Sequence, residues 1–331
     1  MAGPFHNAIR GTTAGTPGTG AFTPNAAATG FIAWSTVSSG WIGLVRYEDG
    51  SNWELSYSYW NGTTLSRPAN GFVSSSSGSQ LSLTSAATAS LVANGYSLAP
   101  DTPGVLRSLT PTPGSTTVTA VGMASATATG TAANATIAAT NYLTEQPRVQ
   151  ITSATTANAQ CGYSHTAVYG MTSTNAGRGG WKFRARFGAT TLPTGPRLFA
   201  GMTATSYVAS TAEPSAFVAA FAVHGFDSTD SNVIQLITNA AASGSGAKIS
   251  TGITFAVTGW YESAIWCDPG STTIKALLIR WDTGDIHYTT TSTDVPASGA
   301  LLVPQCLGGL SATTGTAFVM QFGGYSVRAG G

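Results

Sequence analysis

Six carboxylates in the second half of the chain are the side chains best suited to acid–base chemistry. Cleaving a glycan needs two of them close together, one to protonate the leaving oxygen and one to attack or to activate water. Most lie in expected turns, where Asp is favoured because it hydrogen-bonds to nearby backbone. The six are Glu213, Asp227, Asp230, Glu262, Asp268 and Asp282. The sequence does not determine which of them are close in space, and the expected turns explain most of them, so we predict that the chain is not an enzyme, with a glycan depolymerase as an alternative.

Two short acidic motifs are explained by turns. Asp282-Thr283-Gly284 matches the sequence of an aspartic-protease loop, but such an enzyme needs two of these loops, which share a proton. Asp285 follows the triplet, and a hairpin turn between two strands explains it. Residues 227–232 have an acidic spacing that suits oxygen ligands of Ca²⁺, yet they lack the full loop pattern. We therefore expect two turns and no metal site.

The histidines and cysteines are too scattered to form a metal site, a nucleophile motif or a disulfide framework. We expect each histidine to lie in the core or on the surface and the thiols to be small buried groups. Residues 244–248, Gly-Ser-Gly-Ala-Lys, lack the spacing and the helix of a phosphate loop and are expected to form a flexible turn, so we predict no cofactor. The residues concerned are His6, His165, His224, His287, Cys161, Cys267 and Cys306.

Residues 181–187 have the alternating pattern of a strand and carry three cationic side chains that could bind a ligand. Lys182, Arg184 and Arg186 alternate with bulky apolar residues, which places three cations on one face of a strand. This face is a possible ligand or inter-subunit surface, or else a solvated strand face. The tryptophans of the same region fill a core or offer aromatic faces to a ligand, and we favour the core. They are Trp181, Trp260, Trp266 and Trp281.

The composition limits the partners of the protein. Only 8% of the 331 residues are charged and the net charge is +1, so we expect no affinity for nucleic acid and a surface rich in Ser, Thr, Gly, Asn and Ala. Apolar runs are of strand length, so we expect no membrane insertion. Residues 1–10 lack the basic and apolar regions of a signal peptide, and we expect synthesis in a cytoplasm.

The first part of the chain shows clear strand signals. In residues 52–59, Trp53, Leu55, Tyr57 and Tyr59 alternate with polar residues, which predicts a strand with this apolar face buried and the polar face wet. Residues 41–47 predict a preceding strand. Asn61-Gly62 suits a tight turn, after which residues 63–67 would return antiparallel. Together these signals predict a small aromatic-cored β-meander.

The rest of the chain completes an all-β prediction. Proline, then an Ala/Thr/Ser/Gly run, marks residues 100–140 as a connector, which is either a flexible linker or thin β-structure packed against other subunits. From 141 to 331, at least eight strands with turns between them predict a two-sheet jelly roll. We thus expect domains at 1–99 and 141–331, joined by 100–140.

With these residues in view, the chain resembles proteins of tailed bacteriophages. The first hundred residues look like a small β-domain that opens many tail, neck and fibre proteins, with a Trp-Glu strand at 53–54 and a Gly-Thr-Thr-Leu-Ser-Arg return at 62–67. The last part is similar to appendage domains with Thr-Asn-Tyr, here 140–142, and an aromatic strand ending in Arg-Phe-Gly, here 186–188.

The resemblance implies a structural virion protein, made in the cytoplasm of a bacterial host. It would be a trimer whose first domain attaches to portal, neck, tail or capsid proteins. Its jelly roll would face the host and bind a surface glycan. An alternative is a capsid decoration or head-fibre protein with no receptor role.

Overall fold

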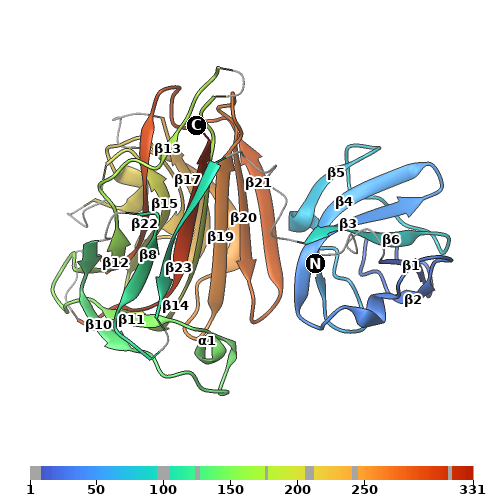
Figure 1. The fold of residues 1–331 in the computed structure, drawn as a ribbon, viewed down its shortest axis with the longest axis horizontal. Coiled ribbons are helices and arrows are strands. Elements are labelled where there is room, and N and C mark those ends of the chain that lie inside the picture. Colours follow the sequence, from blue (N-terminus) through green and yellow to red (C-terminus); the bar gives the residue numbers. More distant parts are fainter. Residues whose placement is uncertain are drawn as a thin grey trace. The chain divides into compact units, whose positions relative to one another are not determined.

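The computed structural model describes residues 9–94, 104–112, 114–123, 127–175, 178–205, 212–240, 245–311 and 315–330. The chain divides into two compact units, Met1–Asp101 with Gly284–Thr289 and Thr102–Thr283 with Thr290–Gly331. Within the described ranges the regular structure is nearly all strand, and α1 (Tyr142–Glu145) is the only α-helix (Figure 1). The predicted all-β fold is confirmed. None of the described helices is long and apolar enough to cross a bilayer.

The first unit is a six-stranded antiparallel sheet in the order β2-β1-β6-β3-β4-β5. Its centre is the predicted hairpin, in which Trp41 pairs with Trp60 and Asp49 with Asn52. Gly50 turns the chain at φ +62°, a conformation that glycine adopts without strain. The strands are β1 (Arg10–Thr13), β2 (Pro24–Ala27), β3 (Trp41–Asp49), β4 (Asn52–Trp60), β5 (Phe72–Ser75) and β6 (Thr88–Asn94).

Two details of this hairpin region differ from the prediction. Residues 63–67 form no strand: Leu65 alone makes isolated antiparallel bridges, one to Trp60 at the end of β4 and one to Phe22, and the strand that returns along β4 is β5. The Asn61 carboxamide accepts hydrogen bonds from the backbone of Thr63 and Thr64, which closes a local loop in place of a continuing ladder. Pro68 also follows, and it has no N–H to donate to a ladder.

The face of β4 that was predicted to be wet is buried. Glu54, Ser56 and Ser58 are 0% exposed, whereas Trp53, Leu55 and Tyr59 of the predicted core face are only half-buried and Tyr57 alone of that face is buried, at 3% exposed. The polar groups of this buried face are paired: Ser56 donates to Glu54 over 2.6 Å, and the Ser58 hydroxyl lies 2.7 Å from the Tyr47 hydroxyl. Small serines leave room for the large rings of the core, which include Phe22, Trp34 and Tyr47.

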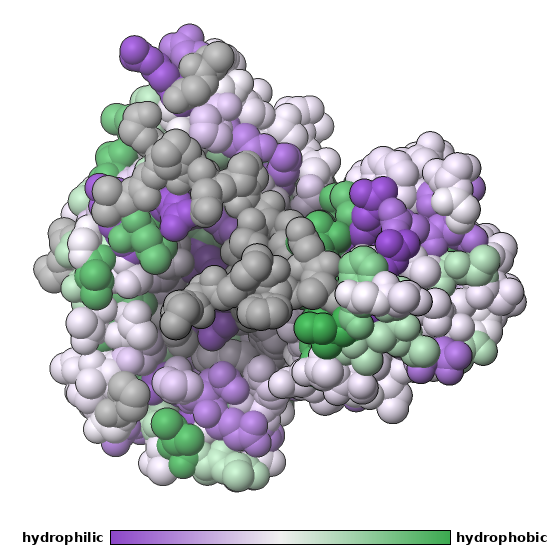
Figure 2. All heavy atoms as spheres, turned by 45° about the vertical axis from the view of Figure 1, so that its right-hand side comes forward, coloured by the Kyte–Doolittle hydropathy of each residue, from purple (hydrophilic) through white to green (hydrophobic). Residues whose placement is uncertain are grey.

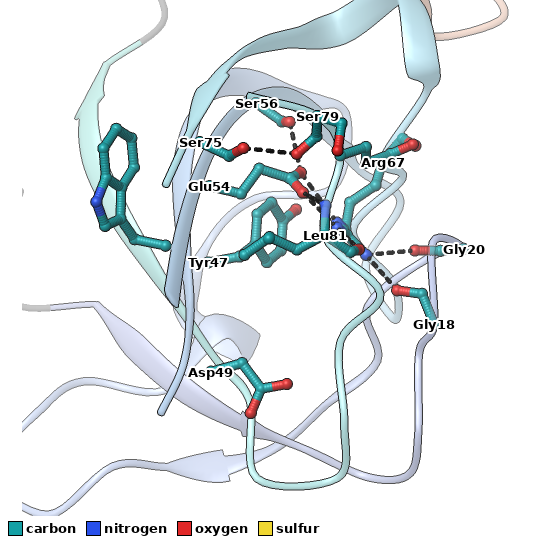
Figure 3. A network of polar contacts seen from close by, with 12 residues as sticks. Gly18, Gly20, Tyr47, Asp49, Glu54, Ser56, Arg67, Ser75, Ser79 and Leu81 are labelled. Carbon is teal, nitrogen blue, oxygen red and sulfur yellow. Dashed lines mark hydrogen bonds and ion pairs between the residues drawn. The ribbon is translucent and has the colours of Figure 1, made fainter. Parts of the chain in front are cut away.

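A fully buried ion pair lies at the centre of this unit (Figure 3). Arg67 Nη2 is 2.6 Å from Glu54 Oε2, and both side chains are 0% exposed. The Glu54 carboxylate also accepts the backbone N–H of Leu81, and the Arg67 guanidinium lies 4.8 Å from the centre of the Tyr47 ring. Arg67 donates further hydrogen bonds to the backbone oxygens of Gly18, Gly20 and Leu81. The pair thus fastens two separate loops to β4.

The other two antiparallel sheets contain the strands of the second unit, and they also include β21, whose residues 285–289 are grouped with the first unit. The nine-stranded sheet runs β10-β11-β23-β14-β19-β20-β21, with β7 paired to β23 and β8 paired to β7. The eight-stranded sheet runs β18-β17-β16-β15-β22-β12-β9, with β13 beside β22. The first comprises β7 (Gly104–Pro111), β8 (Val118–Val121), β10 (Thr131–Asn134), β11 (Val149–Thr152), β14 (Trp181–Thr191), β19 (Trp260–Cys267), β20 (Ile274–Arg280), β21 (Asp285–Thr291) and β23 (Val319–Gly330). The second comprises β9 (Thr127–Thr129), β12 (Gln160–Ser164), β13 (Gly170–Met171), β15 (Pro196–Thr203), β16 (Phe221–Phe226), β17 (Val233–Asn239), β18 (Ala247–Thr254) and β22 (Leu301–Leu310).

The two sheets face one another across a single aromatic core. Tyr261 of the nine-stranded sheet and Phe226 of the eight-stranded sheet both pack on Phe255. The contact between His224 of β16 and Ser263 of β19 also crosses from one sheet to the other. The predicted two-sheet jelly-roll sandwich is confirmed.

The residues predicted as a connector contribute strands to this unit. β7 pairs with β23 and carries β8 on its other side, while β9 pairs with β12 and β10 with β11. Small Ala, Thr and Gly side chains bury little area, but their backbone groups complete sheet ladders. Of the two interpretations of this segment, the structure describes thin β-structure, with its partner strands in the same chain.

Candidate functional site

The three cations singled out from the sequence lie on β14, between β23 and β19 in the nine-stranded sheet. Phe183 and Phe187 point into the core and are 0% exposed, so Arg184 and the other cations lie on the outer face of the sheet. The Lys182 ammonium is 5.8 Å from the centre of the Trp266 ring. The strand alternation thus places the cations on one outward-facing row.

Arg184 and Arg186 share one carboxylate, that of Glu262 on β19. Arg184 Nε and Nη2 donate to its two oxygens over 2.5 and 2.9 Å, and Arg186 Nε donates over 2.9 Å. The Glu262 side chain is only 4% exposed, while the two arginine side chains are 28% and 38% exposed. Two positive charges therefore meet one negative charge, and the solvent contacts mainly the positive groups.

Beside these arginines the outer face of the sheet is hollowed into a groove of about 190 Å³. We call it the arginine groove and define it by Ser108, Thr110, Arg184, Arg186, Gly324 and Ser326. The pairing of β14 with β23 shifts register between Arg186 and Phe187, opposite Gly323 and Gly324. A side chain at position 324 would collide with the Leu109 carbonyl, its Cβ only 2.6 Å away. Glycine at position 324 therefore lets β23 and β7 approach each other beside the groove.

The groove offers hydrogen-bonding groups and no carboxylate among its described lining residues. Guanidinium groups donate in a planar fork that suits hydroxyl and carboxylate oxygens, and serine and threonine hydroxyls both donate and accept. Such a lining can hold a polar ligand. It lacks the two carboxylates that glycoside hydrolysis requires.

Each of the six carboxylates considered for catalysis is held by a lysine or arginine. The pairs are Glu213 with Arg197, Asp227 and Asp230 with Lys248, Glu262 with Arg184 and Arg186, Asp268 with Lys275, and Asp282 with Arg280. Glycoside hydrolysis needs one carboxyl group to protonate the leaving oxygen and a second to attack or to activate water, whereas each of these carboxylates is in an ion pair with a lysine or an arginine. The arrangement suits structural ion pairs.

The acidic residues at 227–232, which were expected to form a turn and not a Ca²⁺ site, bind the ammonium group of Lys248. Lys248 Nζ lies 2.6 Å from Asp227 and 2.8 Å from Asp230, between the two carboxylates. Ser215 also binds Asp227 through its backbone N–H and its hydroxyl. The described residues contain no group of three His, Cys, Asp or Glu that could hold a metal ion. Residues 282–284 form a turn between β20 and β21, as expected.

The hydrogen bonds of Glu213 should make the neighbouring turn, Pro214–Ala216, sensitive to acid. Burial alone would raise the pKa of Glu213, but hydrogen bonds from Arg197 and Ser228 outweigh it and hold that pKa below its usual range. This contribution to stability is present above a pH of about 4.3, the usual Glu value, and is lost as the pH falls through the lower folded-state pKa. We expect the backbone amides of Ser215 and Ala216, in the adjoining 3-10 turn Pro214–Ala216, to lose protection relative to their intrinsic exchange rates as the pH falls through that pKa. Hydrogen exchange of wild type and E213Q at pH 6 and pH 3.5 checks this; a wild type no less protected at the lower pH contradicts it.

Sequence reasoning missed a contact between a histidine and a serine. His224 Nδ1 lies 2.7 Å from Ser263 Oγ, the kind of pair that activates a nucleophile in some enzymes. Both residues are 0% exposed in the core between the sheets, so the pair is structural. Their separation of 39 residues gives no local signal. His165 is 1% exposed, where burial lowers its pKa, while His6 and Gly244 lie outside the described residues.

The three cysteines are buried free thiols, as predicted. Burial raises the pKa of Cys161 and of Cys267 to about 12. Because the thiolate is the reactive form, we expect the native protein to react slowly with a disulfide reagent at pH 8, and the unfolded protein to react at once with all three thiols. The time course of absorbance with and without urea measures this. Rapid modification of the native protein would contradict it.

A second hollow, of about 340 Å³, lies on the first unit beside β2. It is lined by uncharged residues that include Trp34 and Trp60. These two side chains are only 1% and 3% exposed, so neither offers a ring face to a ligand. The arginine groove, with its exposed guanidinium groups, is therefore the stronger candidate site.

No protein-family model and no curated protein matches the chain. Similar solved structures include a protein of unknown function from Shewanella oneidensis MR-1, at 13% identity over 62% of this chain and 77% of that one, with a TM-score of 0.43. Peanut lectin with a nine-residue peptide is 11% identical, over 62% of this chain and 98% of the lectin chain, with a TM-score of 0.42. A β-glucanase of Bacillus licheniformis is 13% identical, over 56% of this chain and 79% of the glucanase chain, with a TM-score of 0.35. Each likeness concerns the fold.

Proposed function

We propose that the second unit binds a saccharide in the arginine groove. The observation that carries this proposal is the groove itself, a hollow of about 190 Å³ in which exposed guanidinium groups stand beside short hydroxyl side chains. Saccharides present many hydroxyl oxygens on a compact ring, and planar donors with neighbouring hydroxyls match them. Small-molecule sites are commonly concave with a few convergent polar groups.

The geometry of the groove supports binding of a saccharide and not its cleavage. Glu262, the carboxylate nearest to the groove arginines, is held by both of them and is 4% exposed. The other candidate carboxylates are also in ion pairs, so a proton donor and a nucleophile at catalytic separation are missing from the described groove lining.

Oligosaccharides of bacterial surfaces, immobilised as an array, test this function. We expect the full-length protein to retain a subset of them, and R186Q to retain that subset more weakly. R46Q is the matched control, because it removes the same charge from an exposed ion pair on the first unit. An array that retains no protein contradicts saccharide binding. Release of reducing ends from a bound polysaccharide would favour the depolymerase alternative.

We also propose that the chain is a structural appendage protein of a tailed-phage particle, a trimer attached through its first unit. The sequence pattern supports this, and Glu54 and Arg67, two residues of that pattern, form the buried ion pair of the first unit. Mass spectrometry of purified particles should detect the chain, and a particle reconstruction should place it at the tail, neck or portal. Density on the capsid lattice would favour the decoration alternative, and absence from particles would overturn the proposal. Light scattering of the purified chain tests the trimer.

A further inference from the structure

We infer that the saccharide of the arginine groove carries an acetamido group, whose methyl packs on Val121 and Leu106 while its amide binds the Ser108 hydroxyl. This inference rests on the proposed function, since it names a substituent of the ligand at the same site. Its basis is a pair of exposed apolar side chains that adjoins the hydroxyl-lined wall of the groove.

The strand pairing places these two apolar side chains beside the wall of the groove. Ser108, which lines the groove, pairs with Val121 across the β7–β8 ladder, and Leu106 lies two residues before Ser108 on β7. Residues that pair across a ladder, and residues two apart on one strand, lie on the same face of a sheet. Leu109 is 1% exposed in the core, so the face of Ser108 is the outer one. Val121 and Leu106 therefore adjoin Ser108 on the surface, and we call these two side chains the apolar ledge.

The apolar ledge is unusually exposed. Among the large apolar side chains that the structure describes, the three most exposed are Val121 at 59%, Val218 at 58% and Leu106 at 55%. Two of these three thus lie together at the groove. Covering apolar surface removes it from water, which favours binding. A ligand in the groove that extends past Ser108 therefore gains free energy by covering the apolar ledge.

The size of the apolar ledge suits a substituent of a small ligand. A protein partner commonly covers about 800 Å² on each side of an interface, of which two side chains are a small part. On the face of the molecule drawn in Figure 2, exposed apolar side chains likewise form small patches that neutral and hydrophilic surface separates. The adjoining groove has a volume of only about 190 Å³. The occupant that fits both features is a sugar with a small apolar group.

An acetamido group matches the order of chemical groups along this wall. A serine hydroxyl both donates and accepts hydrogen bonds, as do the N–H and the carbonyl oxygen of an amide taken together. The methyl of an acetamido group is bonded to the carbonyl carbon, and the Cβ atoms of paired residues such as Ser108 and Val121 are about 5 Å apart. The amide can therefore bind Ser108 while the methyl covers Val121. A ring hydroxyl would bind Ser108 but would leave the apolar ledge in water.

Bacterial-surface oligosaccharides prepared in three forms, which differ at one ring carbon, test this inference. The forms carry an acetamido group, a formamido group, which lacks only the methyl, or a hydroxyl. We expect the full-length protein to bind the acetamido form most tightly and the formamido form about fourfold more weakly, the effect of one buried methyl. Acetamido and formamido forms that bind equally, or a hydroxyl form that binds as tightly as the acetamido form, would overturn the inference while leaving saccharide binding intact. Binding of none of the forms would overturn the proposed function itself.

The variant V121T locates the methyl at the apolar ledge, because threonine keeps the shape of valine and replaces one methyl by a hydroxyl. We expect the ratio of acetamido to formamido affinity to fall from about fourfold to below about twofold. Binding of the formamido form should stay unchanged, which shows that the groove is intact. V218T is the matched control, because Val218 is 58% exposed and lies outside the groove lining, and it should keep the wild-type ratio. A ratio in V121T as large as in V218T would overturn the inference.

Discussion

Replacing Arg67 by methionine should lower the free energy of unfolding of the first unit by about 3–5 kcal/mol. The variant leaves the Glu54 carboxylate without its cation in a site where both side chains are 0% exposed. It also removes the donors to three backbone oxygens, those of Gly18, Gly20 and Leu81. A buried charge without a partner is far more costly than the loss of one hydrogen bond, because it cannot return to water without opening the fold.

Hydrogen exchange of the full chain measures this loss where it occurs. Amides of β4 and β5 should lose most of their protection in R67M, while those of β16 and β19 in the second unit keep theirs. R46M is the matched control: Arg46 pairs with Glu48 on the surface and is 46% exposed, so its loss should cost at most about 1 kcal/mol. The double variant E54L/R67M removes both charges and should recover much of the stability. If R67M were as protected as R46M, the ion pair would not support this unit.

The buried polar face of β4 shows what the sequence of a strand determines and what it leaves open. Alternation establishes which residues share a face, and residues 52–59 do alternate in the structure as predicted. It does not establish which face is inside when both faces carry apolar or small residues. Glu54 is buried because Arg67, 13 residues later, neutralises it, and that partner follows a loop whose course no local pattern determines.

The candidate site shows the same limit at longer range. The outward row of Lys182, Arg184 and Arg186 follows from alternation alone, because the alternate positions hold Trp181, Phe183, Ala185 and Phe187, which are all apolar. The groove beside it depends on β7, which pairs with the last strand of the chain, and on a carboxylate 76 residues beyond Arg186. Residues 104–111 give a weak strand signal among prolines, and only the pairing with β23 makes them part of a sheet.

Replacing Phe255 by alanine should lower the free energy of unfolding of the second unit by about 3–5 kcal/mol. The Phe255 side chain is 1% exposed, and its ring centre lies 4.9 Å from that of Tyr261, 5.6 Å from that of Phe226 and 6.3 Å from that of Phe318. Truncation removes contacts to both sheets at once and leaves a cavity that rigid neighbouring strands cannot close. Hydrogen exchange of β16 and β19 amides in urea should report the loss. V257A, two residues away at a side chain that is 46% exposed, should change stability by no more than about 0.5 kcal/mol. A loss in F255A as small as that of V257A would mean that the two sheets are not held together through this ring.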